Sequence, residues 1–132
     1  MVPRPVALGL MLCEKVIVEE GTKSVSLIGT FSKVRGRTFP LTTIPFCVVA
    51  TLTGAQGEGT VSLNVTDLRT NEEKPVRTER MDFAHRFAEL RIAWRLPRFV
   101  FPEPGDYVFT LMVDDEWVAQ RRIIVRESES EA

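Results

Sequence analysis

Residues 99–125 constrain the fold more than any other stretch, because apolar side chains recur there at every second position. Tyr107, Phe109, Leu111 and Val113 are separated by single residues, and this spacing places all four on one face of a β-strand. A short acidic segment follows, and a second extended segment runs from there to Val125. A strand, a polar turn and another strand in this order predict a β-hairpin.

The sequence defines the turn of this hairpin and the core-facing side of its second strand less clearly. We expect a three-residue turn at positions 114–116, although such turns favour glycine at their last position and this chain has glutamate there. The more apolar face of the returning strand also carries Arg121. The side chains that we expect in the core from this face are Trp117, Ala119, Ile123 and Val125.

The segment before the hairpin predicts a turn. Pro102 and Pro104 cannot donate a hydrogen bond to a sheet, and Gly105 follows them. Tyr107, the only tyrosine of the chain, stands two residues further on. This order resembles the start of strand F in immunoglobulin-like sandwiches, where a tyrosine hydroxyl bonds to backbone a few residues upstream.

The rest of the chain repeats the same pattern of short extended segments between turns. Strands are predicted at 6–13 with an extension at 16–18, and at 24–31, 44–53, 61–66 and 90–96. Residues 77–88 favour an extended segment, with a single helical turn as the alternative. Loops are expected at 33–40, 53–59 and 67–75. The pattern predicts an all-β protein, a single immunoglobulin-like antiparallel β-sandwich of about seven to nine strands.

Length and composition fit one globular domain. The chain has 132 residues, of which 44% are hydrophobic and 27% charged, so it can bury a stable core without disulfide bonds or metal ions. We expect a flexible lead at 1–5, the sandwich at 6–126 and a disordered acidic tail at 127–132.

Charge and hydropathy argue against several partners. The net charge of −1 predicts no strong attraction to nucleic acid or to an anionic membrane. The apolar run at 6–12 is short, and Leu12 stands where a lipoprotein signal needs a small residue before Cys13. We therefore expect a cytoplasmic protein.

Two stretches near the ends, LMLCEKVIVEEGTKSVSLIGTF and FPEPGDYVFTLMVDDEWVAQRRIIV, resemble an uncharacterised family of bacterial β-sandwich proteins, a domain of unknown function. The similarity is looser between residues 54 and 90. The resemblance implies a single sandwich and a bacterial origin, and it brings no catalytic residues.

No constellation of catalytic or metal-binding residues stands out. His85 is the only histidine, and it lies between two phenylalanines in the extended interpretation. Cys13 and Cys47 fall on different predicted strands, so they are either buried free thiols or one disulfide. The acidic turn lacks the EF-hand pattern, and the glycine-rich loop at 53–59 lacks the ending of a phosphate-binding loop. We expect no enzyme, no cofactor and no metal.

The cations are unevenly divided, with thirteen arginines against four lysines, which is either a compositional habit of the source genome or a means of recognising planar anions. Guanidinium groups bind carboxylate and phosphate through two parallel hydrogen bonds. The candidate contacts to an anion or a partner are Arg35, Arg37, Arg91 and Arg95. The alternative for the strand at 90–96 is a solvated face whose arginines pair with Glu79, Asp82 and Glu89.

Two functional hypotheses follow. The first is a non-enzymatic structural or protein-interaction module that associates with an unknown protein partner or with itself as a homodimer. This hypothesis rests on Val108 and Met112, which place apolar side chains on a second face of the hairpin. The alternative is a domain that binds a small anion or carbohydrate with the loops 33–40, 53–59 and 98–103 at one end of the sandwich.

Overall fold

The computed structural model describes residues 5–128, which contain strands and turns and no helix. Eleven strands follow one another in this range, and three of them have four residues or fewer. They are β1 (Val6–Val18), β2 (Val25–Thr30), β3 (Lys33–Gly36), β4 (Leu41–Thr42), β5 (Phe46–Thr53), β6 (Gly57–Asp67), β7 (Glu72–Phe83), β8 (Leu90–Leu96), β9 (Val100–Phe101), β10 (Gly105–Val113) and β11 (Glu116–Glu127).

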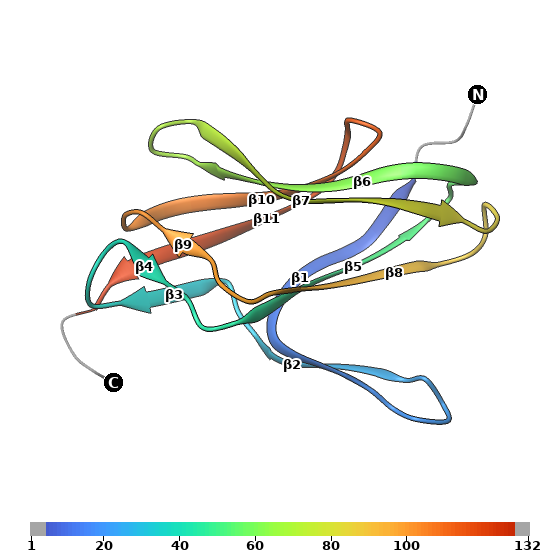
Figure 1. Ribbon diagram of the computed structural model, residues 1–132, viewed down its shortest axis with the longest axis horizontal. Helices are drawn as coiled ribbons and strands as arrows, with labels where there is room; N and C mark the ends of the chain where they lie inside the picture. The colour runs from blue at the N-terminus through green and yellow to red at the C-terminus, as the bar shows by residue number, and fades with distance from the viewer. Residues whose placement is uncertain (1–4, 129–132) are drawn as a thin grey trace.

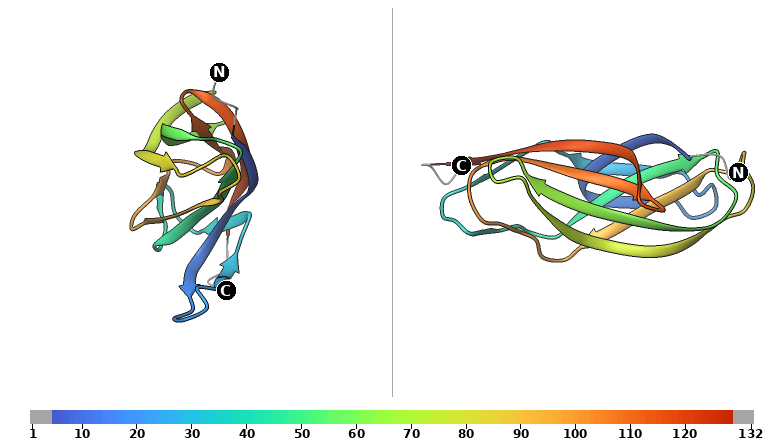
Figure 2. Two further views of the ribbon diagram at one scale, coloured as in Figure 1. Left: turned by 90° about the vertical axis from the view of Figure 1, so that its right-hand side faces the viewer. Right: turned by 90° about the horizontal axis from the view of Figure 1, so that it is seen from above.

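Two sheets lie face to face and form the body of the molecule (Figures 1 and 2). The four-stranded sheet has the order β2-β1-β5-β8, and the five-stranded sheet has the order β3-β11-β10-β6-β7. All neighbouring strands are antiparallel except β3, which runs parallel to β11. The short pair β4–β9 lies at one end, beside β3. The all-β prediction is confirmed for the described residues.

The core fills the space between the two sheets. The four side chains that alternate along β10 are all buried there, as the period of two predicts. Side chains from the other sheet face them, among them Leu12, Leu52 and Trp94. Burying each large apolar side chain stabilises the fold by about 1.5–3 kcal/mol. Aromatic rings meet edge to face at one end of this core, where the ring centroids of Phe46 and Phe109 are 6.4 Å apart.

The hydroxyl of Tyr107 makes the backbone contact that its position predicts. It donates to the carbonyl oxygen of Glu103 at 2.6 Å and accepts from the amide of Glu103 at 3.3 Å. Pro102 and Pro104 cannot pair within a sheet, so this side chain secures the turn that they form. The turn between β9 and β10 is therefore tied to the core through a buried ring.

The acidic turn of the final hairpin differs from the prediction. It has two residues, because Val113 pairs directly with Glu116. Asp114 and Asp115 have φ values of 50° and 66°, which is the left-handed region that a two-residue type I′ turn requires and that Asp tolerates. The Asp114 carboxylate also accepts from the amide of Thr60 at 2.9 Å. This contact gives the first acid of the turn a structural role.

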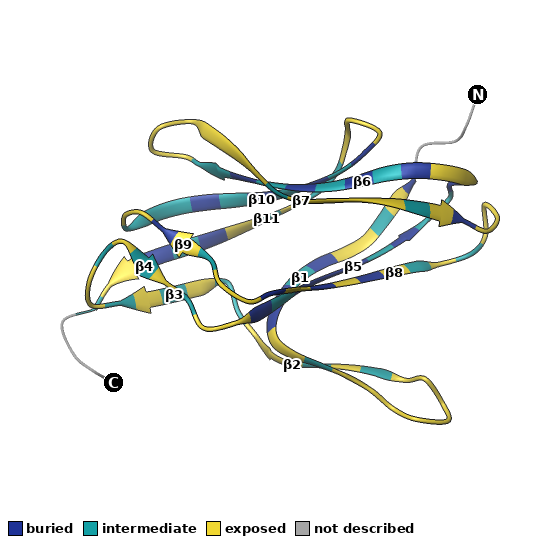
Figure 3. Ribbon diagram, viewed as in Figure 1, coloured by how far each residue is buried: buried dark blue, intermediate teal, exposed yellow. Residues whose placement is uncertain are grey.

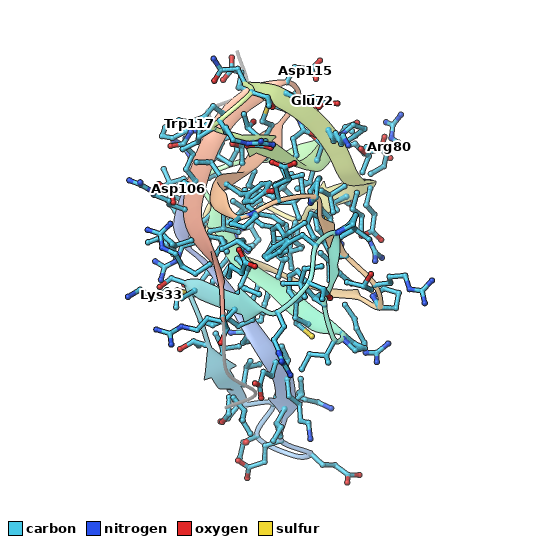
Figure 4. The ribbon with its side chains drawn as sticks, turned by 90° about the vertical axis from the view of Figure 1, so that its left-hand side faces the viewer. Lys33, Glu72, Arg80, Asp106, Asp115 and Trp117 are labelled. Carbon is cyan, nitrogen blue, oxygen red and sulfur yellow. The ribbon has the colours of Figure 1, made fainter. Side chains whose placement is uncertain are left out.

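A bulge in β11 explains a second correction. Leu111 pairs with Ala119, but Met112 pairs with Trp117, so β11 holds one extra residue at this point. Because of this extra residue, the alternation of side chains between the two faces of β11 shifts by one position before the bulge. Ile123 and Val125 are buried as expected, Ala119 is half-buried, and Trp117 is 53% exposed at the surface (Figure 4). The prediction of a buried Trp117 is wrong for this reason.

Other boundaries moved because strands run further than the polar sequence suggests. The loop expected at 67–75 shrinks to 68–71, since β6 and β7 pair along their whole length as a long hairpin. Residues 77–83 are extended, as favoured, and 84–89 are not. Pro5 of the predicted lead is buried, and Glu127 of the predicted tail belongs to β11. Ser128 of the predicted tail is half-buried, and residues 1–4 and 129–132 lie outside the described residues.

Two phenylalanines offer a matched test of this core. Phe109 is fully buried, whereas Phe87 is 80% exposed in the turn between β7 and β8. We expect Phe109→Ala to lower the free energy of unfolding by about 3–5 kcal/mol. The control Phe87→Ala should change it by less than about 0.5 kcal/mol. Urea denaturation followed by circular dichroism measures both, and equal losses would contradict this packing.

The Tyr107 contact predicts a dependence of stability on alkaline pH. Burial, as the largest cause, raises the pKa of the Tyr107 phenol above its usual value. The folded chain therefore favours the neutral phenol, and this contribution is present below about pH 10 and is lost as pH rises through the raised pKa. We expect the melting temperature of the wild type to fall more steeply above about pH 10 than that of Tyr107→Phe. Parallel pH profiles would contradict the assignment.

Candidate functional site

A β-hairpin arm projects from the body of the molecule. The arm, defined here as residues 14–30, consists of the second half of β1, the turn at 19–24 and β2. It extends away from the five-stranded sheet in two views of the molecule (Figures 1 and 2). No residue of the arm is buried, and Figure 3 shows it as exposed along most of its length.

Apolar side chains lie on both faces of the arm. Val18 on one face is 58% exposed, and Ile17 and Ile28 on the other are 43% and 45% exposed. The register supports these facings, since Ile28 pairs with Lys15 and Ile17 pairs with Ser26. A hairpin that carries apolar residues on two uncovered faces is unusual for a monomer, because water contacts both.

Local interactions hold the arm in shape. At its tip, the amide of Glu19 donates to the carbonyl of Ser24 at 2.8 Å, and the amide of Lys23 donates to the carbonyl of Glu19 at 3.0 Å. Near its root, Gly29 has a φ of 71°, and a β-carbon there would lie 2.9 Å from the side chain of Glu14. A side chain at position 29 would therefore require the side chain of Glu14 to move.

The outer edge of the arm is a free sheet edge. β2 is the terminal strand of the four-stranded sheet, and its sequence VSLIGT contains no charge and no proline. Natural edge strands are commonly protected by lysine, proline or a covering element. Within the described residues, β2 has none of these devices.

A cleft opens where the edges of the two sheets meet on the opposite side. β7 is the edge of the five-stranded sheet and β8 is the edge of the four-stranded sheet. The cleft has a volume of about 420 Å³, within the usual range of small-molecule pockets. Its apolar lining comes from both sheets and from the turn after β8: Val65, Pro75, Val76, Leu96, Pro97, Phe99, Val100, Pro102 and Tyr107.

Charged groups surround this apolar surface. Lys74 forms an exposed ion pair with Glu72 at 3.9 Å, and the guanidinium of Arg77 lies 5.4 Å from the ring centroid of Trp94. Arg95 and Arg98 also line the cleft, and among residues 5–128 neither guanidinium group has a hydrogen bond or an ion pair. The cleft thus places two guanidinium groups that have no side-chain partner beside apolar and aromatic side chains.

The structure separates the four arginines predicted as contacts. Arg95 lines the cleft, while Arg35 lines a second cavity of about 410 Å³ beside β3 and β4. Arg91 is exposed on β8, and Arg37 is exposed after β3. The four side chains do not form one site. The cleft became visible only with the sheet edges in place, because its lining comes from segments far apart in the chain.

Two related expectations need correction. The segment 33–40 is not all loop, because Lys33–Gly36 form β3 beside β11. It lies with residues 98–103 at the end that holds the β4–β9 pair, whereas residues 53–59 lie at the other end (Figure 1), where the amide of Gly54 donates to the carbonyl of Arg86. The acids expected to pair with the arginines of β8 do not do so. Glu79 instead accepts from the indole nitrogen of Trp94 at 2.8 Å.

The residues that could act in catalysis or bind a metal do not lie together. His85 is exposed, and its Nδ1 accepts from the amide of Phe87 at 3.3 Å. Cys13 and Cys47 are free and pair directly across β1 and β5. Among residues 5–128, no three His, Cys, Asp or Glu side chains gather as a metal site. The same residues include no helix with the length and hydropathy to cross a membrane.

These features define an all-β protein with two packed sheets, an exposed hairpin arm and an edge cleft. The chain belongs to the family of unknown function DUF6941, whose model matches residues 8–126. This match includes both of the end segments that suggested the family, so the prediction that the chain belongs to a family of unknown function is confirmed.

Solved structures show the same fold in a much larger protein. Two crystal structures of a β-glucosidase from Listeria innocua, one of them in complex with isofagomine, match with a TM-score of 0.53 and 8% sequence identity. The match covers 96% of this chain and 16% of the β-glucosidase chain. At this identity the likeness concerns the fold alone. A comparison with curated proteins found no match.

Proposed function

We propose that this protein is a non-enzymatic interaction module that forms a homodimer through the free edge of its β-hairpin arm. The observation that carries the proposal is the uncharged, unprotected edge of β2 on an arm that is apolar on both faces. Val108 and Met112, which suggest a dimer when the sequence is considered alone, are half-buried in the single chain and do not support one.

A second copy fits this edge by symmetry. Antiparallel pairing of β2 with β2 of another copy is isologous, so each strand satisfies the open backbone groups of the other. The two sheets then join into one continuous sheet. Apolar residues such as Ile28 of the two arms come together across the new strand pair.

Charge along the arm supports the same partner. The turn at the tip carries two acids, Glu19 and Glu20, and one base, Lys23, while β3, which follows the root, carries Lys33 and Arg35; all are exposed. Antiparallel pairing brings the tip of each arm toward the root of the other, so the acidic excess at the tip of one copy faces the basic side of its partner. Opposite charges at these positions favour this orientation and its register.

Sedimentation of two matched variants tests the dimer. Ile28→Lys places a charge at the free edge, and we expect it to weaken self-association at least about tenfold, or about 1.4 kcal/mol. Ile44→Lys makes the same exchange at an exposed isoleucine outside the arm, and it should leave the dissociation constant unchanged. Circular dichroism checks that both variants fold.

Two results would refute the homodimer. The first is a wild type that sediments as a monomer at all concentrations up to about 100 μM, two orders of magnitude above a micromolar dissociation constant. The second is a dimer that Ile28→Lys and Ile44→Lys affect equally.

The finer description of the protein is also part of the proposal. We propose that the two sheets form an immunoglobulin-like sandwich, which the Tyr107 hydrogen bond at the start of β10 supports. We further propose a bacterial protein of the cytoplasm without nucleic acid or membrane partners. The net charge of −1 and the low cysteine content support this part.

A second candidate function is binding of a small anion, which the unpaired Arg95 and Arg98 of the cleft favour. Their guanidinium groups suit a carboxylate, and the aromatic and proline side chains suit an apolar body attached to it. A carbohydrate acid or an aromatic carboxylate has this chemistry.

A thermal-shift screen with aromatic carboxylates and sugar acids tests this candidate. A ligand at a hundredfold excess over its dissociation constant adds about 2.7 kcal/mol to stability. We expect the double variant Arg95→Ala/Arg98→Ala to lose the shift and Arg91→Ala, on the same strand outside the cleft, to keep it. No shift with any anion, or a shift that both variants retain, would contradict the site.

A further inference from the structure

We infer that Cys13 and Cys47 form a reversible intramolecular disulfide when the protein meets a small disulfide oxidant such as oxidised glutathione. The two residues are exact partners in the register of β1 and β5, so their side chains leave the same face of the sheet side by side. Both are free thiols in the structure. This modification does not depend on the proposed dimer.

The spacing of antiparallel partners suits the bond. Directly opposed residues have Cα atoms about 4.5 or about 5.5 Å apart, depending on the type of pair. Both values fall within the range of about 4.4–6.8 Å found in disulfides. The two thiols also lie outside the main core cluster, on the other face of the four-stranded sheet from Leu12 and Val48. A bond there does not displace the core side chains.

The unequal exposure of the two thiols sets the order of the steps. Cys47 is half-buried, whereas Cys13 is fully buried, so a small oxidant reaches Cys47 first. Burial, followed by the proximity of Cys47, raises the pKa of the Cys13 thiol, which keeps that group protonated and slow to react by itself. Cys47 also lies directly opposite Arg95 of β8, whose positive charge attracts the anionic glutathione.

The reaction balances in two exchanges. The Cys47 thiolate attacks one sulfur of oxidised glutathione, which forms a mixed disulfide on Cys47 and releases one reduced glutathione. The Cys13 thiol then loses its proton, and the thiolate attacks the Sγ atom of Cys47 and displaces the second glutathione. Two protein thiols are oxidised, one oxidant molecule is reduced to two thiols, and the two protons leave with them.

The product links β1 to β5 at the root of the arm. Cys13 pairs with Thr30 of β2 on its other side, so the bond lies in the row of residues where the arm leaves the body. Oxidation cross-links the chain across residues 14–46 and restricts the unfolded state, which stabilises the folded form.

Mass spectrometry of the full chain under glutathione buffers tests the inference. We expect the folded wild type to lose two hydrogens, with a Cys13–Cys47 cross-linked peptide and full reversal by dithiothreitol. The ratio of oxidised to reduced glutathione needed for half-oxidation should be at least about tenfold lower for the folded chain than for the chain in denaturant. The rate should rise with pH, because the thiolate is the attacking species.

Single variants separate the two steps. Cys13→Ser should accumulate the glutathione adduct on Cys47, and Cys47→Ser should remain unmodified while folded. The inference is overturned if the folded wild type accumulates the adduct without the internal bond or forms only intermolecular disulfides. It is also overturned if the folded chain is no easier to oxidise than the denatured chain.

Discussion

The burial of one face of each sheet against the other is the interaction on which the rest of the structure depends. Side chains from β10, β6 and β11 meet those from β1, β5 and β8, and the largest of them, such as Phe101 and Phe109, are excluded from water. Each element gains stability only where a second layer covers it. The arm and the cleft are therefore the places where this layering stops.

The same constraint accounts for both candidate sites. β1 is longer than the layer that covers it, so its second half and β2 have no opposing sheet and leave apolar residues in water. At the opposite side, β7 and β8 end the two sheets without pairing with one another, and the space between their edges forms the cleft. A sandwich closed along both sides would have neither feature.

Alternation in the sequence was enough to predict the class of fold and several strands in detail. The strand at 90–96 has the predicted bounds, and the inward set of β10 is the predicted one. The errors arise where geometry depends on a single residue or on distant partners. One extra residue in β11 turned Trp117 outward, and two aspartates with positive φ shortened the turn.

The candidate sites were harder to predict, because they depend on which strands become neighbours. The arginines along β8 were recognised, but only the sheet order shows that Arg95 lines a cleft and Arg91 does not. The apolar residues of the arm suggested ordinary core strands, since a sequence does not reveal where the covering sheet ends. The opposition of Cys13 and Cys47 likewise follows from register.

The crossing of the chain from one sheet to the other has a mechanical consequence. The amide of Phe31 donates to the carbonyl of Leu12 in one sheet, and the carbonyl of the next residue, Ser32, accepts from the amide of Ile124 in the other. Adjacent residues thus anchor the base of the arm in both layers. Tension on the arm is shared between the first and the last strands of the fold, so a load applied at its tip is carried by the whole body.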